Sequence, residues 1–179
     1  MYSLTIEAPN AATGEFGDMD DDAQNTDDTA PGTVVVRETG KGEFQQEVIS
    51  GPHRLLADEP AAVGGLDSGP GPYELLLAAL GACTTITLRL YADRHQLPLT
   101  RTQVRLRHER IYATDCAECE TRSGMIDRID RAITIEGDLN AEQRARLMAI
   151  AEKCPVHRTL KSEVDIRTVE ESAASKGSK

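Results

Sequence analysis

A long apolar segment in the middle of the chain constrains the fold more than any other feature. Residues 73–96 contain no helix breaker except Gly81, and apolar side chains occupy almost every side of the segment through Leu90. A helix that is hydrophobic all round belongs in a protein core, and Pro72 suits its first turn. We therefore expect one long buried helix around which the rest of the domain is organised.

Short strand-like segments precede this helix. Residues 33–38, 44–49 and 53–57 are rich in β-branched or alternating apolar side chains, with a Gly-Pro turn at 51–52. Residues 61–72 contain too many Gly and Pro residues for either a helix or a strand. The sequence thus predicts a small β-meander and then a loop that leads into the helix.

Two further strands and a second helix are expected after the long helix. Residues 102–111 alternate, with Val104, Leu106 and His108 on one face, and residues 129–136 place Ile133 and Ile135 on one face. Asn140 is a suitable N-cap for an amphipathic helix over 141–153, and residues 163–169 resemble a closing strand. Runs of strands interrupted by helices indicate the α+β class.

Both ends of the chain have the composition of disordered segments. Residues 1–32 hold six aspartates between positions 18 and 28, and residues 170–179 read EESAASKGSK. Such segments bury too little apolar surface to become ordered. We expect disordered tails at 1–32 and 170–179, and one folded domain over 33–169.

Charge and composition exclude some partners and favour others. The net charge of −10 argues against nucleic acid, which requires clustered Lys and Arg. With aromatic residues at only 3%, the core must be aliphatic, so a homodimer interface would add needed buried area. The first residues lack the features of a signal peptide, and the longest apolar run, residues 75–83, is short for a membrane span. These features predict a cytoplasmic protein without a membrane or nucleic-acid partner.

Four cysteines in such a protein suggest redox, metal-binding or buried roles, because structural disulfides are rare in the cytoplasm. Cys83 lies within the apolar helix, where a buried thiol is usually inert. Gly81 and the hydroxyl-bearing residues from Thr84 onward favour instead a small polar ligand beside Cys83. If Pro155 opens a new helix, Cys154 is its N-cap, where the helix dipole stabilises a thiolate. The alternative is that Cys154 simply ends the preceding helix.

The sequence around both cysteines resembles the OsmC/Ohr family of osmotically inducible and organic-hydroperoxide-resistance proteins. Residues 69–83 read GPGPYELLLAALGAC, and about 70 residues after Cys83 comes KCPVH, which contains Cys154. The resemblance covers roughly residues 33–169. It implies an α+β fold with strands around the central helix, and an intertwined homodimer with each active site at the interface.

The same resemblance implies a cysteine-based peroxidase. By position, Cys83 would be the peroxidatic cysteine, oxidised by a hydroperoxide to a sulfenic acid, and Cys154 the resolving one. In family peroxidases a Glu directly follows the helix-opening Pro and, with an Arg from the N-terminal strands, activates the thiolate. Here Tyr73 holds that position and Glu74 follows it, while Arg37 and Arg54 are the candidate arginines.

Cys116 and Cys119 form a C-x-x-C motif in the connection between the two later strands. They could supply half of a zinc site, with His108 as the best further ligand. They could be a redox pair, although Asp115, Glu118 and Glu120 should raise their pKa values and slow attack. They could also be two idle cysteines in a polar loop. No cofactor is required by any of the other motifs.

Two hypotheses for the function follow. The first is a homodimeric peroxidase acting on organic hydroperoxides in oxidative-stress defence, with a dithiol as reductant and Cys83, Cys154, Glu74 and Arg37 as site residues. The second is a non-catalytic module that uses the same pocket to bind a small apolar ligand.

Overall fold

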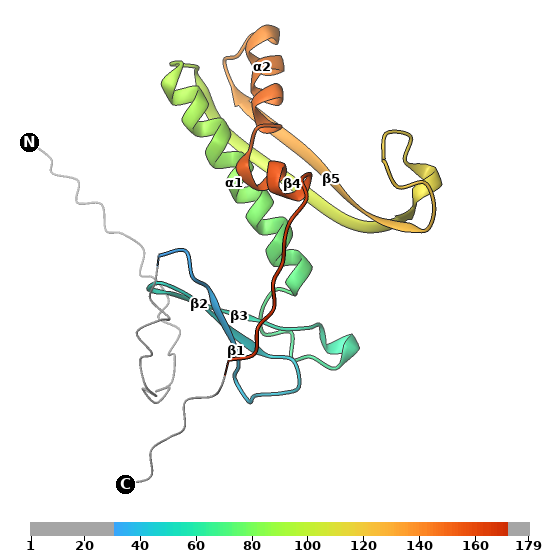
Figure 1. Cartoon of the computed structure of the whole chain (residues 1–179). Coiled ribbons are helices and arrows are strands. Elements are labelled where there is room, and N and C mark those ends of the chain that lie inside the picture. The colour runs from blue at the N-terminus through green and yellow to red at the C-terminus, as the bar shows by residue number, and fades with distance from the viewer. Residues whose placement is uncertain (1–30, 172–179) are drawn as a thin grey trace, which may run out of the picture.

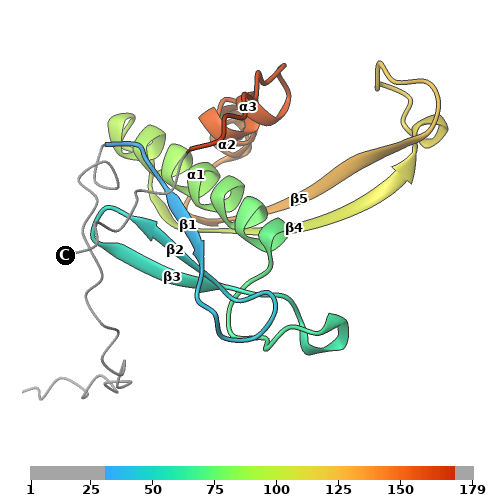
Figure 2. The same cartoon turned by 60° about the horizontal axis from the view of Figure 1, so that its bottom comes forward.

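The computed structural model describes residues 31–171, and the two expected tails lie almost entirely outside that range. Figure 1 shows a long helix, α1 (Pro72–Arg94), between a three-stranded sheet on one side and two short helices on the other. The turned view of Figure 2 shows the same arrangement. The α+β class predicted from the sequence is confirmed.

The three-stranded sheet forms from the segments expected to be strands. It contains β1 (Val35–Glu38), β2 (Gln46–Ser50) and β3 (His53–Ala57) in antiparallel order β1-β2-β3. Ile49 and Ala57 are its buried apolar residues. The sheet holds Arg37 and leads into the loop that ends at α1.

Asp58 organises the loop between β3 and α1. Its carboxylate accepts hydrogen bonds from the backbone N–H groups of Glu59 at 2.8 Å and Leu66 at 3.1 Å. It also accepts from the hydroxyl of Ser68 at 2.7 Å and from the Ser68 N–H at 3.3 Å. These bonds satisfy backbone groups of a Gly- and Pro-rich segment that has no ladder, and in which, contrary to the expectation of no helix, Ala61–Val63 form one short 3₁₀ turn, η2. They fix the chain just before Pro72 opens α1.

The second sheet is a long hairpin of β4 (Leu99–Tyr112) and β5 (Met125–Gly137), which pair antiparallel over nearly their whole length. Both strands are longer than predicted, and Val104, Leu106 and His108 share the more buried face of β4 as expected. β4 packs on α1. In both views the tip of the hairpin projects away from the helices.

The main core lies between the C-terminal half of α1, the helix α2 (Ala141–Ala151) and the adjoining ends of the hairpin. α2 begins at Ala141, and Asn140 is its N-cap as predicted, with a reciprocal capping box in which the Gln143 N–H donates to the Asn140 side chain at 2.8 Å. The short helix α3 (Pro155–Leu160) follows. The buried core residues are aliphatic, as the composition requires: Leu88, Ala92, Leu99, Leu139, Leu147 and Ala151.

The prediction that α1 is buried on all sides is wrong for the single chain. Only Leu80, Thr84, Leu88 and Ala92 are buried, and they form one stripe at helical spacing. On the opposite side Ile86 is 58% exposed and Leu90 63%. By length and a mean hydropathy of 1.6 alone, α1 could span a membrane, contrary to the estimate from the shorter apolar run. It nevertheless packs on β4, α2 and α3, as a core helix does.

The strand expected over 163–169 is absent from the described part of the chain. The segment after α3 is extended but has no ladder partner, and Ile166 and Val169 are 83% and 80% exposed. A strand needs a neighbour to take up its backbone N–H and C=O groups. The alternating sequence of residues 163–169 indicates an extended backbone. It does not indicate whether the edge of a sheet is near enough to pair with it.

Candidate active site

Cys83 and Cys154 lie together, although 70 residues separate them in the sequence. Cys83 is in the middle of α1 and half-buried, whereas Cys154 is fully buried at the start of α3. The two thiols lie close enough to shift each other's pKa values, and both are free. The structure thus brings the two thiols near each other, and a disulfide between them stays a prediction.

Of the two alternatives for Cys154, the structure shows the one in which Pro155 opens a new helix. Pro155 occupies the first position of α3, and Cys154 is its N-cap, with φ −53° and ψ 129°. The backbone N–H groups of Val156 and His157, which have no partner within the helix, therefore face the Cys154 sulfur. A thiolate at this position receives hydrogen bonds that a thiol in the middle of a helix would not.

The two thiols have opposite pKa shifts. Burial raises the pKa of Cys83, and its interaction with Cys154 raises it further; the Val156 N–H and the Thr87 hydroxyl only partly offset this. Burial also raises the pKa of Cys154, but hydrogen bonds from Cys83, the His157 N–H, Thr84 and the Val156 N–H outweigh it, so the pKa is lowered. The first proton lost by the pair therefore leaves its negative charge mainly on Cys154.

Arg131, which the sequence analysis missed, joins this site from β5. Its side chain is 9% exposed, and its Nη1 donates to the Thr84 hydroxyl oxygen at 3.1 Å and to the Ala151 carbonyl at 3.3 Å. Its Nη2 donates to the Glu152 carboxylate at 2.7 Å. A sequence signal existed: Arg131 shares the period-two register of Ile133 and Ile135, so a charged residue falls on the inward face of the strand.

Arg37 and Glu74 lie elsewhere in the single chain. Arg37 is held by Glu47, with its Nε donating to the carboxylate at 2.9 Å, and Arg54 lies 4.0 Å from the same residue. Glu74 is exposed and accepts a hydrogen bond from the Gly71 N–H at 2.9 Å, so it caps the helix. Neither Arg37 nor Glu74 is among the groups that shift the pKa of Cys83.

An open groove follows α1 along β4 and includes Glu74. It has a volume of about 590 Å³. Gly81 allows the close packing along it, since a Cβ there would lie 3.0 Å from a methyl group of Leu106. The approach to the backbone that Gly81 suggested is therefore made by Leu106. The lining is mostly apolar: Pro70, Glu74, Leu77, Ala78, Gly81, Ala82, Thr85, Val104 and Leu106.

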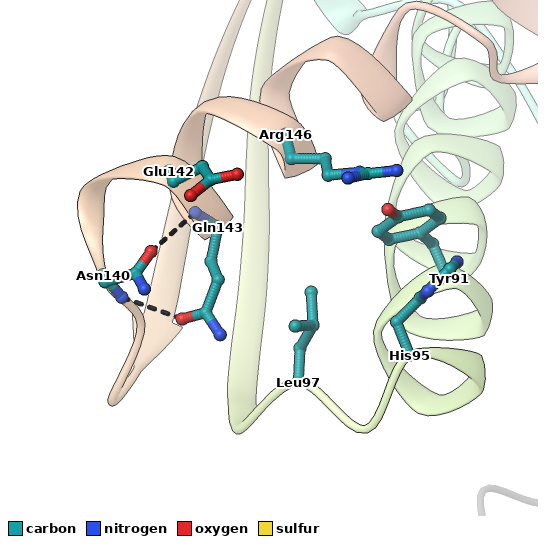
Figure 3. Close-up of a pocket in the computed structure, with 7 residues that line it drawn as sticks. All are labelled: Tyr91, His95, Leu97, Asn140, Glu142, Gln143 and Arg146. Carbon is teal, nitrogen blue, oxygen red and sulfur yellow. Dashed lines mark hydrogen bonds between the residues drawn. The ribbon is translucent and has the colours of Figure 1, made fainter.

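A smaller cavity of about 290 Å³ lies between the end of α1 and the start of α2 (Figure 3). Tyr91, His95 and Arg146 line it, and the capping pair Asn140 and Gln143 stands opposite. Tyr91 is more than two helical turns from Cys83 along α1. This cavity is therefore separate from the thiol pair.

The C-x-x-C motif forms a disulfide at the hairpin tip, with the Cα atoms of Cys116 and Cys119 5.5 Å apart. Between residues 31 and 171 no group of three or more His, Cys, Asp or Glu side chains is placed to hold a metal ion. His108, the expected further ligand, instead stacks on Tyr73 at 4.2 Å and bonds Asp127 at 2.9 Å. A zinc ion at Cys116 and Cys119 would need the reduced thiols, and remains an untested prediction.

Comparison with known proteins identifies the family. The family model for OsmC-like proteins matches residues 65–169, which is more than half of the chain. The chain belongs to the OsmC-like family. This match includes Cys83, Cys154 and Arg131, so all three lie in the family domain. The comparison with curated proteins found no match.

Solved OsmC-like structures share the fold. The OsmC-like protein of Mycoplasma pneumoniae is 21% identical with a TM-score of 0.54, and the match covers 72% of this chain and 84% of that one. An organic hydroperoxide resistance protein OsmC of Legionella pneumophila is 23% identical with a TM-score of 0.52, covering 74% and 92%. The organic hydroperoxide resistance protein OhrB of Bacillus subtilis is 21% identical with a TM-score of 0.50, also covering 74% and 92%. At these identities the likeness establishes the fold alone.

Proposed function

We propose that this OsmC-like protein is a homodimeric, thiol-dependent peroxidase that reduces organic hydroperoxides in oxidative-stress defence. The observation that carries the proposal is the contact between two free thiols, of which Cys83 is reachable and Cys154 is buried. A pair of this kind can be oxidised by a small molecule at one thiol and closed by the other. The family, which includes organic hydroperoxide resistance proteins, supports the same chemistry.

The two thiols divide the reaction according to access and charge. The lowered pKa of Cys154 gives it the first negative charge of the pair, but its sulfur is enclosed. Cys83 becomes the nucleophile when its proton passes to Cys154. The Cys83 thiolate then attacks the outer oxygen of the O–O bond, the alkoxide leaves and takes a proton to become the alcohol, and Cys83 becomes a sulfenic acid.

The second step closes the disulfide. The Cys154 sulfur attacks the sulfur of the Cys83 sulfenic acid, the S–O bond breaks, and water leaves. The net reaction converts two thiols and one hydroperoxide into a disulfide, an alcohol and water. A dithiol reductant, whose two thiols are oxidised in exchange, restores the pair. Burial of Cys154 next to Cys83 favours this capture over further oxidation.

A second copy of the chain is expected to complete the site. The exposed face of α1, including Ile86 and Leu90, is apolar, and the segment after α3 exposes Val164, Ile166 and Val169. Covering these surfaces would give the aliphatic domain the buried area that one chain lacks. In the dimer an arginine such as Arg37 of the partner subunit, together with Glu74, would stabilise the Cys83 thiolate. The single chain provides no such charged group beside Cys83.

Turnover of small hydroperoxides tests the proposal. The reduced protein with a dithiol reductant should consume cumene hydroperoxide or tert-butyl hydroperoxide, and Cys83→Ser should abolish this consumption. The double variant Cys116→Ser with Cys119→Ser is the matched control and should retain it, because its disulfide lies at the hairpin tip. Absence of turnover with every dithiol tried, or loss of turnover only in the control, would refute the proposal.

A binding module is the second candidate, and one observation favours it. In the single chain Arg37 is engaged by Glu47 and Tyr73 replaces the activating Glu, so no charged group lowers the pKa of Cys83, which stays raised. The mostly apolar groove along α1 would then hold a small apolar ligand. A protein that binds such a ligand, and whose thiol pair stays reduced in excess hydroperoxide, would fit this function instead.

A further inference from the structure

We propose that Arg131 is a positioning residue of the thiol pair, which holds the Cys154 sulfur against Cys83 and keeps a positive charge one hydroxyl group away from it. The inference deepens the proposed peroxidase function and rests on it for the consequence in turnover. The placement of Cys154 and the charge beside it can be tested without any turnover.

An arginine on the inward face of a strand requires an explanation. Nearly fully buried charged side chains occur almost only where they are paired, and a hydrophobic side chain of similar size would often serve stability as well. Arg131 takes a register position between Ile129 and Ile133 on that face of β5. Both terminal nitrogens of its guanidinium donate to groups near the two cysteines: the Thr84 hydroxyl, the Ala151 carbonyl and the Glu152 carboxylate.

The contacts of Arg131 fix the chain on both sides of Cys154. The Ala151 carbonyl accepts a hydrogen bond from Arg131 and also one from the Cys154 backbone N–H, each at 3.3 Å. The guanidinium therefore anchors the turn that places Cys154 at the start of α3. Glu152, in the same turn, is held by the second guanidinium nitrogen at 2.7 Å.

Thr84 links Arg131 to the sulfur. Its side chain is fully buried, directly follows Cys83 in α1, and contacts the Cys154 thiol. The hydroxyl oxygen accepts from Arg131 while its proton is donated to the Leu80 carbonyl at 2.8 Å. That carbonyl also has its helical backbone partner, so the proton can turn toward a thiolate on Cys154. An N–H donor on the oxygen polarises the hydroxyl and strengthens that bond.

Groups from four elements surround Cys154. Cys83 and Thr84 of α1 and the backbone N–H groups of Val156 and His157 in α3 interact with its thiol directly. The charges of Arg131 from β5, Glu152 from the end of α2 and Lys161 act on the neighbouring His157, and Arg131 reaches the sulfur through the Thr84 hydroxyl. Glu152 also lies 3.1 Å from His157 and partly neutralises the positive side of this set. Arg131 and Glu152 therefore act on a Cys154 thiolate with opposite signs.

The opposite charges of Arg131 and Glu152 allow an electrostatic role of Arg131 to be distinguished from simple packing. Arg131→Met keeps most of the side-chain length and removes the charge, so the pKa of Cys154 should rise by about one unit. Arg131→Lys keeps the charge but loses the fork of donors, and should raise it less. Glu152→Gln removes the neutralising carboxylate and should lower it. If Arg131 were only a packing element, none of these changes would follow charge.

The measurement uses full-length protein in which Cys83, Cys116 and Cys119 are replaced by Ser, so that Cys154 is the only thiol. Thiolate absorbance in the ultraviolet is followed against pH for this parent and for the three variants within it. The expected order of the Cys154 pKa, from lowest to highest, is Glu152→Gln, parent, Arg131→Lys, Arg131→Met. An unchanged pKa in Arg131→Lys together with an unchanged or raised one in Glu152→Gln overturns the inference, even if Arg131→Met fails to fold.

Turnover distinguishes this inference from the proposed function. In the otherwise native chain the pH profile of hydroperoxide consumption should move in the same direction as the Cys154 pKa. If no variant and no native protein turns over hydroperoxide but the titration order holds, the peroxidase fails and the role of Arg131 in placing and charging Cys154 stands. If the native protein is active and Arg131→Met leaves both its titration and its pH profile unchanged, the inference fails and the peroxidase stands.

Discussion

Thr84→Val should destabilise the domain, although it replaces only the hydroxyl group of one fully buried side chain. The substitution keeps the β-branched shape and replaces the hydroxyl by a methyl group. Arg131 then loses the acceptor at 3.1 Å, and its Nη1 retains only the Ala151 carbonyl at 3.3 Å. The Leu80 carbonyl loses the side-chain donor at 2.8 Å but keeps its helical partner.

The magnitude follows from the charge on Arg131. A hydrogen bond to a charged group contributes about 1.5–3 kcal/mol, and the guanidinium is too buried for water to replace the lost partner readily. The added methyl group recovers part of this through apolar burial. We expect a net loss of about 2 kcal/mol in the free energy of unfolding, or roughly 4–8 °C in Tm for a domain of this size.

Urea unfolding and thermal melting, at equal protein concentrations, measure the effect. Thr85→Val is the matched control: it makes the same change one residue later, where the hydroxyl donates only to the Ala82 carbonyl of its own helix. Its effect should stay within about 0.5 kcal/mol. Equal losses in Thr84→Val and Thr85→Val, or no loss in either, would refute the claim that Thr84 joins Arg131 to the thiol site.

Two further predictions concern assembly and pH. Sedimentation at micromolar concentration should show a homodimer, whose interface we expect to bury at least the roughly 1,200–2,000 Å² of a standard interface. Leu90→Glu on the exposed face of α1 should weaken the dimer, and a stable native monomer would contradict this prediction. Hydrogen bonds, that from Ser68 foremost, lower the pKa of Asp58 despite its burial, so its carboxylate stabilises the fold above about pH 4 and this contribution is lost as the pH falls through the lowered value. Asp58→Asn should therefore reduce stability at neutral pH and make it less sensitive to acid, and an unchanged acid transition in this variant would rule out the role given to Asp58.

Patterns within single segments were predicted well from the sequence. The apolar run that follows Pro72, the alternation in β4 and the Asn140 cap each depend on neighbours a few residues away, and each element formed within a few residues of its expected bounds. The Cys154 N-cap also followed from one local feature, the Pro155 beside it. The contact of Cys83 with Cys154 came from the family resemblance instead, because no local pattern joins residues so far apart.

The errors concern what the neighbours of a segment provide. The composition of α1 indicates apolar surroundings on every side, but a single chain covers only the stripe through Leu80 and Leu88. Residues 163–169 have a strand pattern without a sheet edge to pair with. Arg131 was overlooked because its partners, Thr84 and Ala151, come from two other elements, and only its register with Ile133 indicated an inward position. The spacing and composition around Cys116 and Cys119 could not distinguish a disulfide between them from a zinc site or two idle thiols.

Disulfide mapping after stoichiometric oxidation tests the central claim most directly. The fully reduced protein is treated with one equivalent of an organic hydroperoxide, blocked with an alkylating agent, digested and analysed by mass spectrometry. The account predicts an intramolecular bond between Cys83 and Cys154, formed as the alcohol appears, and a stable sulfenic acid on Cys83 when Cys154 is replaced by Ser. A bond confined to Cys116 and Cys119, or a Cys83–Cys154 pair that stays reduced while the hydroperoxide persists, would contradict it.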